Sequence, residues 1–199
     1  MKKISLSIAA VSILLVACGV DTTGLSPASS RKPLGSESAF VLVQEFADLE
    51  CPACAQANTL ITKPLLQSYG DRIRFQFMHF PLSQHGNAME AALALECAAD
   101  QGKFWQLLDL AYERQATLGS TALRQWAEEL ELDTVLFDRC IRSNIKNAAV
   151  LADFGEGERI GVNQTPTYFV NGVKVNDASY AGVTTAVDTA LQQIEQIPL

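Results

Sequence analysis

Apolar residues recur along this chain with two periods, one typical of strands and the other of helices. Residues 40–46 (FVLVQEF) are rich in valine and phenylalanine and predict a buried strand. Over 72–79 (RIRFQFMH) apolar and polar positions alternate, as in a half-buried strand. Between the two runs, residues 52–69 predict a helix that ends at Gly70 and is kinked by Pro64.

A long helical region follows. Apolar residues stand at helical spacing from about 87 to 152 without a strand signal. Ser120 and Asp133 are the expected N-caps of two helices in this region. The glycines between 155 and 161 are expected to end it.

The C-terminal part returns to strand signals. The dipeptide Asn171-Gly172 lies between β-prone runs at 165–170 and 173–175, which predicts a hairpin. Residues 183–196 predict a final amphipathic helix. The expected order is therefore strand, helix, strand, helical insertion, hairpin, helix.

The N-terminus is typical of an exported protein. Residues 1–17 place two lysines before an apolar run that is too short to cross a membrane, as in a secretory signal. The run ends in the letters LVAC, which resemble the bacterial lipobox, so Cys18 is the expected lipidated first residue of the mature chain. An ordinary cleavable signal is the alternative. Several acyl chains on one residue anchor a protein stably, so we expect a membrane-anchored lipoprotein facing the periplasm or the cell exterior of a bacterium.

Composition separates a tether from a domain. Residues 18–38 are rich in Gly, Ser, Thr and Pro and predict a lipidated flexible tether outside the fold, whereas residues 39–199 suit a single domain with one core. The formal net charge is −7, and it becomes −9 when Lys2 and Lys3 leave with the signal. This acidic balance argues against nucleic acid as a partner and is expected to serve solubility.

The motif Cys51-Pro52-Ala53-Cys54 stands where the first strand gives way to a helix. If Cys51 is the N-cap, Pro52 takes the first helical position, where its missing N–H costs nothing. Cys51 then faces the unpaired N–H groups of the helix, which favour a thiolate, and Cys54 follows one turn later on the same face. The alternative is half of a zinc site, which would need a second pair of ligands at similar spacing, and the sequence contains none. We therefore expect catalytic Cys51 and Cys54 and no metal.

Two further cysteines, Cys97 and Cys140, lie in apolar helical contexts. Outside the cytoplasm a structural disulfide between them is favoured, with two buried free thiols as the alternative. The bridge would close a loop of about 44 residues and contribute roughly 4 kcal/mol.

Taken together, these motifs resemble the thioredoxin superfamily, and more narrowly the DsbA-like thiol-disulfide oxidoreductases, here in a lipoprotein form. The similarity runs from about residue 40 to the C-terminus. It is carried by EFAD (45–48), CPAC (51–54), HFPL (79–82) with His85, QGKFW (101–105) and TPTYFVNG (165–172).

The resemblance implies an α/β protein, a thioredoxin fold with a helical domain inserted at about 87–152. It also implies that Pro166 is a cis-proline packed against the cysteine pair and that the Thr165 backbone pairs with extended substrate peptides. The cysteine pair replaces any cofactor. The strongest oxidants of the family carry a histidine between the cysteines, so Ala53 at that place indicates a more moderate oxidant.

Glu45 ends the strand that is expected to be buried, where a carboxylate is costly without a task or a partner. Related enzymes carry a buried acid there that relays a proton to the inner cysteine. The alternative is an edge-strand glutamate pointing to water.

Other polar residues near the motif are expected to have simpler roles. Asp48 and Glu50 are expected on the surface of the loop, where they would raise the pKa of Cys51 slightly. His79 is expected to pack at a strand end and His85 to precede the helical region, without carrying protons.

The expected function is thiol-disulfide exchange that forms disulfides in exported proteins. By the resemblance, a membrane redox partner recycles the pair: a quinone-linked protein for an oxidase or a thiol-reducing relay for a reductase. A reductase, an isomerase and a non-enzymatic lipoprotein that binds metal or a partner protein are the alternatives.

Overall fold

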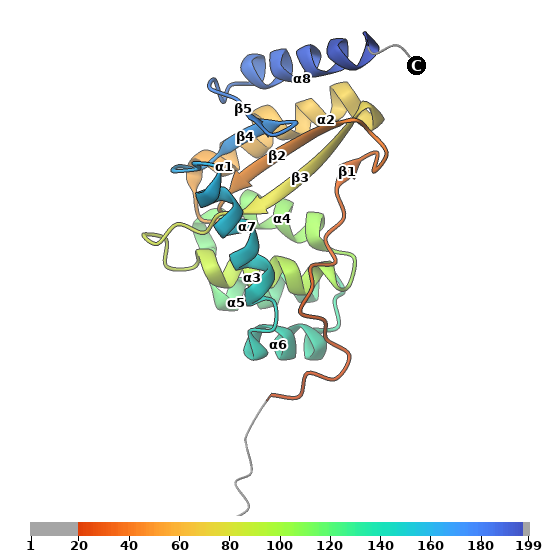
Figure 1. The fold of residues 1–199 in the computed structure, drawn as a ribbon. Coiled ribbons are helices and arrows are strands. Elements are labelled where there is room, and N and C mark those ends of the chain that lie inside the picture. Colours follow the sequence, from red (N-terminus) through yellow and green to blue (C-terminus); the bar gives the residue numbers. More distant parts are fainter. Residues whose placement is uncertain (1–19, 197–199) are drawn as a thin grey trace, which may run out of the picture.

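The computed structural model describes residues 20–196 and has a five-stranded sheet at its centre (Figure 1). The strand order is β1-β3-β2-β4-β5, with β2 and β3 parallel and the other pairs antiparallel. The strands are β1 (Leu34–Gly35), β2 (Val41–Ala47), β3 (Ile73–His79), β4 (Thr167–Val170) and β5 (Val173–Lys174). The predicted α/β class is confirmed, and the predicted elements follow one another in the expected order, but β1 precedes them and was not predicted.

Helices cover both faces of the sheet. In Figure 1, α8 lies at the top, the sheet lies below it with α1 and α2, and α3–α6 form the lower half, to which α7 connects. The α-helices are α1 (Pro52–Ala57), α2 (Lys63–Tyr69), α3 (Ala88–Ala99), α4 (Phe104–Glu113), α5 (Ser120–Glu129), α6 (Thr134–Ser143), α7 (Asn147–Arg159) and α8 (Tyr180–Glu195).

The alternation of side chains along the strands creates two cores. Val43 and Phe75 point into the core that the sheet shares with α1, α2 and α8. Phe46 points to the other face, where it contacts Phe80. The ring of Phe80 in turn stacks on that of Phe154 in α7, with the ring centroids 4.7 Å apart. One face of the central strands is therefore buried, and the face with Phe46 is partly covered.

The helix after the cysteine motif is interrupted by a π-helical turn at Asn58–Thr62. The N–H of Lys63 bonds to the carbonyl of Asn58, five residues earlier. Pro64, at the start of α2, has no N–H and its ring would clash with the preceding turn of a regular helix, so the wider turn accommodates it. The predicted kink therefore takes the form of a π turn.

The helical insertion ends later than predicted. The glycines from 155 to 161 were expected to break the helical region, yet α7 continues to Arg159. Gly157 lies against the Phe80 ring, where an added Cβ would come within 2.7 Å of it. This glycine permits close packing within the helix, so the boundary at about 152 is wrong.

The two predicted N-caps have different outcomes. The carboxylate of Asp133 accepts bonds from the N–H groups of Val135 and Leu136, which confirms it as the cap of α6. Ser120 is the first residue of α5, and Gly119 is the N-cap. The Ser120 hydroxyl bonds instead to Glu90 of α3 at 2.7 Å.

A disulfide joins Cys97 of α3 to Cys140 of α6, with the two Cα atoms 5.9 Å apart. Both residues are buried within the core of the helical insertion. The alternative of two free thiols is therefore wrong, and the bridge ties together two helices that are 43 residues apart in sequence.

The hairpin of β4 and β5 turns at the predicted dipeptide. Asn171 and Gly172 have φ angles of 46° and 79°, the left-handed conformation that this turn requires. The side chain of Asn171 also accepts a bond from the N–H of Leu42 at 2.7 Å. The final helix, α8, starts at Tyr180 and is capped by Ser179, slightly before the predicted start at residue 183.

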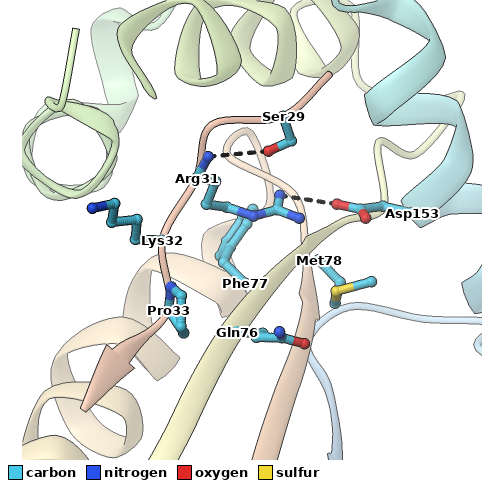
Figure 2. A pocket seen from close by; sticks show the side chains of 8 residues that line it. All are labelled: Ser29, Arg31, Lys32, Pro33, Gln76, Phe77, Met78 and Asp153. Atoms are coloured by element: carbon cyan, nitrogen blue, oxygen red, sulfur yellow. Dashed lines mark hydrogen bonds and ion pairs between the residues drawn. The ribbon is translucent and has the colours of Figure 1, made fainter. Parts of the chain in front are cut away.

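Residues 28–35, which we call the N-terminal strap, lie on the domain. Leu34 and Gly35 pair with Phe75 and Arg74 of β3, and the segment before them passes between the sheet edge and the helical insertion (Figure 2). It borders a cavity of about 290 Å³ together with Gln76, Phe77 and Met78 of β3 and Asp153 of α7. The prediction of a flexible tether outside the fold is therefore wrong for these residues.

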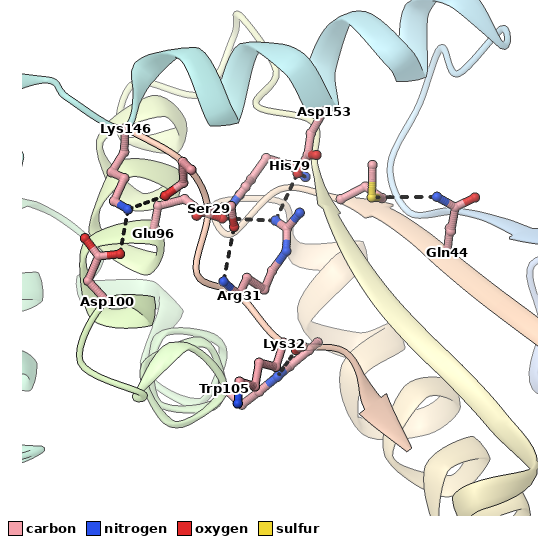
Figure 3. A network of polar contacts seen from close by, with 12 residues as sticks. Ser29, Arg31, Lys32, Gln44, His79, Glu96, Asp100, Trp105, Lys146 and Asp153 are labelled. Atoms are coloured by element: carbon pink, nitrogen blue, oxygen red, sulfur yellow. Dashed lines mark hydrogen bonds and ion pairs between the residues drawn. The ribbon is translucent and has the colours of Figure 1, made fainter. Parts of the chain in front are cut away.

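Buried charges hold the strap (Figure 3). Arg31 Nη1 lies 3.1 Å from Glu96 Oε1 and 2.9 Å from Asp153 Oδ2. The fully buried Lys146 donates to the Ala28 carbonyl and to Asp100, each at 2.6 Å. Composition gave no sign of this because the partners of the strap belong to helices far along the sequence.

His79 belongs to the same network and has the structural role that the sequence indicates. Its ring Nε2 lies 3.0 Å from Glu96 Oε1, and the side chain is buried at the end of β3. Burial alone would raise the pKa of Glu96, but the hydrogen bond with His79 and the charges of His79 and Arg31 outweigh it and lower that pKa to about 2. Cys18 and the predicted signal at 1–17 lie outside the described residues.

Candidate active site

The two cysteines of the motif lie at the end of β2 and the start of α1. Cys51 is the N-cap of α1 and Pro52 its first residue, as predicted. Cys51 is 6 % exposed and Cys54 is completely buried, and both are reduced thiols. The N–H of Cys54 donates to the Cys51 carbonyl at 3.0 Å, so one helical turn holds the pair together.

The environment separates the acidities of the two thiols. A hydrogen bond from the Cys54 thiol is the largest cause that lowers the pKa of Cys51 to about 5, against the opposing effect of burial. Hydrogen bonding at Thr165 and the N–H groups of Cys54 and Ala53 lower it further. Burial raises the pKa of Cys54 far above its ordinary value. At neutral pH Cys51 is therefore a thiolate beside a protonated Cys54.

The loop before β4 completes the site. The Thr165–Pro166 peptide bond is cis, as the resemblance implies, and the Cys51 sulfur lies 3.6 Å from the Thr165 carbonyl oxygen. A groove of about 400 Å³ runs beside this contact, and Leu60 on its wall is 65 % exposed. Its lining is Ala53, Gln56, Ala57, Leu60, Ile61, Gln164, Thr165, Pro166 and Ala178. The groove offers apolar side chains beside Thr165, whose carbonyl contacts the reactive sulfur.

Glu45 is buried in the central strand β2, with strands on both sides. The alternative of an edge-strand glutamate pointing to water is wrong. Its carboxylate accepts a bond from the Thr62 hydroxyl at 2.9 Å, and that hydroxyl lies 3.1 Å from the Tyr168 hydroxyl. Burial, only partly offset by these hydrogen bonds, raises the pKa of Glu45 to about 7.

Asp48 was expected on the surface but is 2 % exposed. Its carboxylate accepts bonds from the N–H groups of Glu50 and Leu82 and from the His85 ring, each at 2.8 Å. Glu50 is half-buried and binds the N–H and the side chain of Asn87. The expectation failed because two of the three donors, the Leu82 N–H and the His85 ring, come from a second loop, which β3 brings alongside the first.

Two polar residues of the helical insertion, Gln115 and Tyr112, also reach the site, and the sequence did not indicate them. The side-chain amide of Gln115 donates to the carbonyls of Leu49 and Cys51 at 2.6 and 3.0 Å. The hydroxyl of Tyr112 is buried without a partner among the described residues, and the charges of Cys54 and Glu45 help burial to raise its pKa. No local pattern marks either residue, since each reaches the site from a helix packed across it.

Within residues 20–196, no group of three His, Cys, Asp or Glu side chains comes close enough together to hold a metal ion. The same residues contain no helix that is both long and apolar enough to cross a membrane.

The sequence matches the thioredoxin family over residues 29–189, a span that includes the strap, the cysteine motif and Pro166. The chain belongs to the thioredoxin family. Its fold is also that of solved DsbA-like structures. BdbD of Bacillus subtilis matches with a TM-score of 0.72 and 22 % identity, over 84 % of this chain and 99 % of that one. The α-DsbA1 protein of Wolbachia pipientis matches with a TM-score of 0.70 and 21 % identity, over 81 % and 91 %.

Relatives with higher identity are longer proteins. The Na(+)/H(+) antiporter NhaA 3 of Salinispora tropica is 37 % identical over 139 residues, which are 69 % of this chain and 21 % of the antiporter. The NhaA antiporter of Herminiimonas arsenicoxydans is 36 % identical over 153 residues, 77 % of this chain and 24 % of its own length. The chain thus spans about a fifth to a quarter of these relatives.

Proposed function

We propose that this protein is an extracytoplasmic thiol-disulfide oxidoreductase that forms disulfides in exported proteins through Cys51 and Cys54. The observation that carries the proposal is the contrast between a thiolate at Cys51, whose pKa is lowered to about 5, and a protonated, buried Cys54. A solved structure with the same fold is described as a thioredoxin-like oxidoreductase of Silicibacter pomeroyi, at 23 % identity and a TM-score of 0.71.

The reaction starts from the Cys51–Cys54 disulfide. A substrate thiolate in the groove attacks the Cys51 sulfur, the bond to Cys54 breaks, and Cys54 receives the electron pair. The high pKa of Cys54 means that its sulfur takes up a proton, for which the buried carboxyl of Glu45 is the proposed donor. A second substrate thiolate then attacks the substrate sulfur of the mixed disulfide and expels Cys51 as a thiolate. The substrate loses two electrons and the cysteine pair gains them.

The groove beside Pro166 supports a protein substrate. An extended peptide can pair with the Thr165 backbone, while apolar residues such as Leu60 contact its side chains. Main-chain pairing gives affinity without demanding one sequence, which suits an enzyme that acts on many exported proteins.

The purified chain tests this activity. We expect the oxidised protein to transfer its disulfide to a reduced test protein, Cys51→Ser to be inactive, and Cys54→Ser to accumulate a mixed disulfide, since the resolving thiol is gone. If the wild type neither oxidises the test protein nor reduces insulin, while Cys51→Ser binds a partner as well as the wild type, the protein is a binding lipoprotein and no enzyme. An isomerase would instead rearrange scrambled disulfides faster than it forms new ones.

We further propose that lipid on Cys18 anchors the protein and keeps it near a membrane redox partner that reoxidises the pair. Tethering raises the effective concentration of the two proteins for each other. Cys18→Ser should move the protein from the membrane to the soluble fraction and slow reoxidation in cells. An ordinary cleavable signal would leave the distribution of this variant unchanged.

A further inference from the structure

His85 lies in the loop between β3 and α3, and the structure brings it to the cysteine site. Parallel strands β2 and β3 end at the same edge of the sheet, with Ala47 opposite His79. The loops that follow them, which carry Asp48 and His85, therefore meet there. The His85 ring Nδ1 lies 2.8 Å from Asp48 Oδ2.

Asp48 links His85 to the motif through its main chain as well. Its carbonyl accepts the N–H of Cys51 at 3.2 Å, while its carboxylate accepts the N–H of Leu82 in the loop of His85. One buried residue thus fixes the imidazole relative to the reactive sulfur. The imidazole side chain itself is 20 % exposed, so it exchanges protons with water.

Three acidic groups act on His85. Burial would lower the pKa of the imidazole, but the hydrogen bond and charge of Asp48 and the charges of Cys51 and Glu50 outweigh it and raise that pKa. Because Asp48 accepts hydrogen bonds from two N–H groups in addition, we assign the proton of this contact to Nδ1, and the second proton of the imidazolium goes to Nε2.

We propose that His85, oriented by Asp48, is a positioning residue whose positive charge stabilises the Cys51 thiolate and so makes the disulfide a stronger oxidant. The inference rests on the proposed function. The sequence has no histidine between the two cysteines, and His85 supplies a positive charge from the neighbouring loop instead.

The interaction is reciprocal. A thiolate that favours the imidazolium is itself favoured by it, so the His85 charge lowers the pKa of Cys51. When the disulfide forms, the thiolate charge disappears and His85 holds its proton less tightly. Two-electron reduction therefore takes up one proton at Cys54 and, near the pKa of His85, a fraction of another at the imidazole.

NMR titration of the wild-type protein tests the coupling directly. The sequence has two histidines, His79 and His85, so the variant His85→Gln assigns their signals. We expect the pKa of His85 to be higher in the reduced than in the oxidised protein by about half a unit or more. Equal values in the two states would overturn the proposal, whatever the variants do.

Variants separate charge from structure. Gln at position 85 can still donate to Asp48 but carries no charge, so we expect the Cys51 pKa, read from thiolate absorbance, to rise by about half a unit to one unit. The equilibrium constant with glutathione should then shift about threefold to tenfold towards the disulfide, tenfold being about 30 mV. His85→Lys should restore most of the charge effect.

Arg159→Gln, which removes an exposed cation on α7, is the control and should change neither quantity. If His85→Gln unfolds at the same urea concentration as the wild type and leaves the Cys51 pKa and the glutathione equilibrium unchanged, the proposal is wrong. Coupling without disulfide transfer to proteins would instead refute the proposed function, so the two failures are distinguishable.

Discussion

Arg31 should make a large contribution to stability although it lies in a segment whose composition is that of a linker. Its side chain is 13 % exposed, and it pairs with Glu96, which is 0 % exposed, and with Asp153, which is 12 % exposed. Replacing it by methionine removes the cation that Glu96 and Asp153 share, while Glu96 keeps its contact with the His79 ring. Removing one partner of a buried ion pair costs about 3–5 kcal/mol, so we expect a loss of about 3 kcal/mol for Arg31→Met.

Urea unfolding of the protein, with the Cys97–Cys140 bridge intact, measures this loss. The matched control is Arg159→Met, because Arg159 pairs with Glu156 on the surface of one helix, with side chains 69 % and 40 % exposed. Exposed pairs of this kind are screened by water and contribute little to stability, so this control should unfold at nearly the same urea concentration as the wild type. For a domain of this size, a loss of 3 kcal/mol lowers Tm by roughly 6–12 °C.

The pH dependence gives a second measurement. Because the folded-state pKa of Glu96 is lowered to about 2, its contribution is present above the unfolded pKa of about 4.5 and is lost as pH falls towards 2. The difference in unfolding free energy between the wild type and Arg31→Met should become smaller over the same pH range. A variant that loses no more than Arg159→Met at pH 7 would show that the Arg31 ion pairs do not stabilise the fold and would refute the reasoning.

Two further predictions follow from buried positions. Because the folded-state pKa of Glu45 is raised to about 7, the wild type should lose roughly 3 kcal/mol of unfolding free energy relative to Glu45→Gln as pH rises from about 4.5 to 7. Urea unfolding of both proteins at pH 5 and pH 8 checks this. A difference in unfolding free energy that is the same at both pH values would contradict it. Gly157→Ala puts a Cβ 2.7 Å from the Phe80 ring and should lower the free energy of unfolding by about 1–3 kcal/mol. Gly155→Ala in the same helix meets nothing within 4 Å and should raise it by up to about 1 kcal/mol. Thermal unfolding of the two variants measures both effects, and equal effects would contradict the packing argument.

Local signals were enough to predict the elements that position the site. Cys51 caps a helix because the residues around it favour a strand before the motif and a proline directly after it, and both preferences act within a few residues. The hairpin at Asn171-Gly172 is predictable for the same reason, since the turn conformation depends on these two residues.

Burial that depends on distant partners could not be predicted. Asp48 looks like an ordinary loop acid until the N–H of Leu82 and the ring of His85 come alongside it. The strap is read as a linker because its composition lacks apolar residues, and the buried charges it meets, Glu96 and Lys146, are recognisable only when the helices are in place.

The direction of electron flow follows from which form of the cysteine pair the fold favours. Every contact that stabilises the Cys51 thiolate acts in the dithiol state and disappears in the disulfide, where Cys51 carries no charge. A pKa of about 5 means that this stabilisation operates throughout the neutral range and favours the dithiol over the disulfide. A stabilised dithiol is also a weak reductant. Substrate oxidation is therefore the direction that we propose, and it requires a stronger oxidant outside the chain to restore the disulfide.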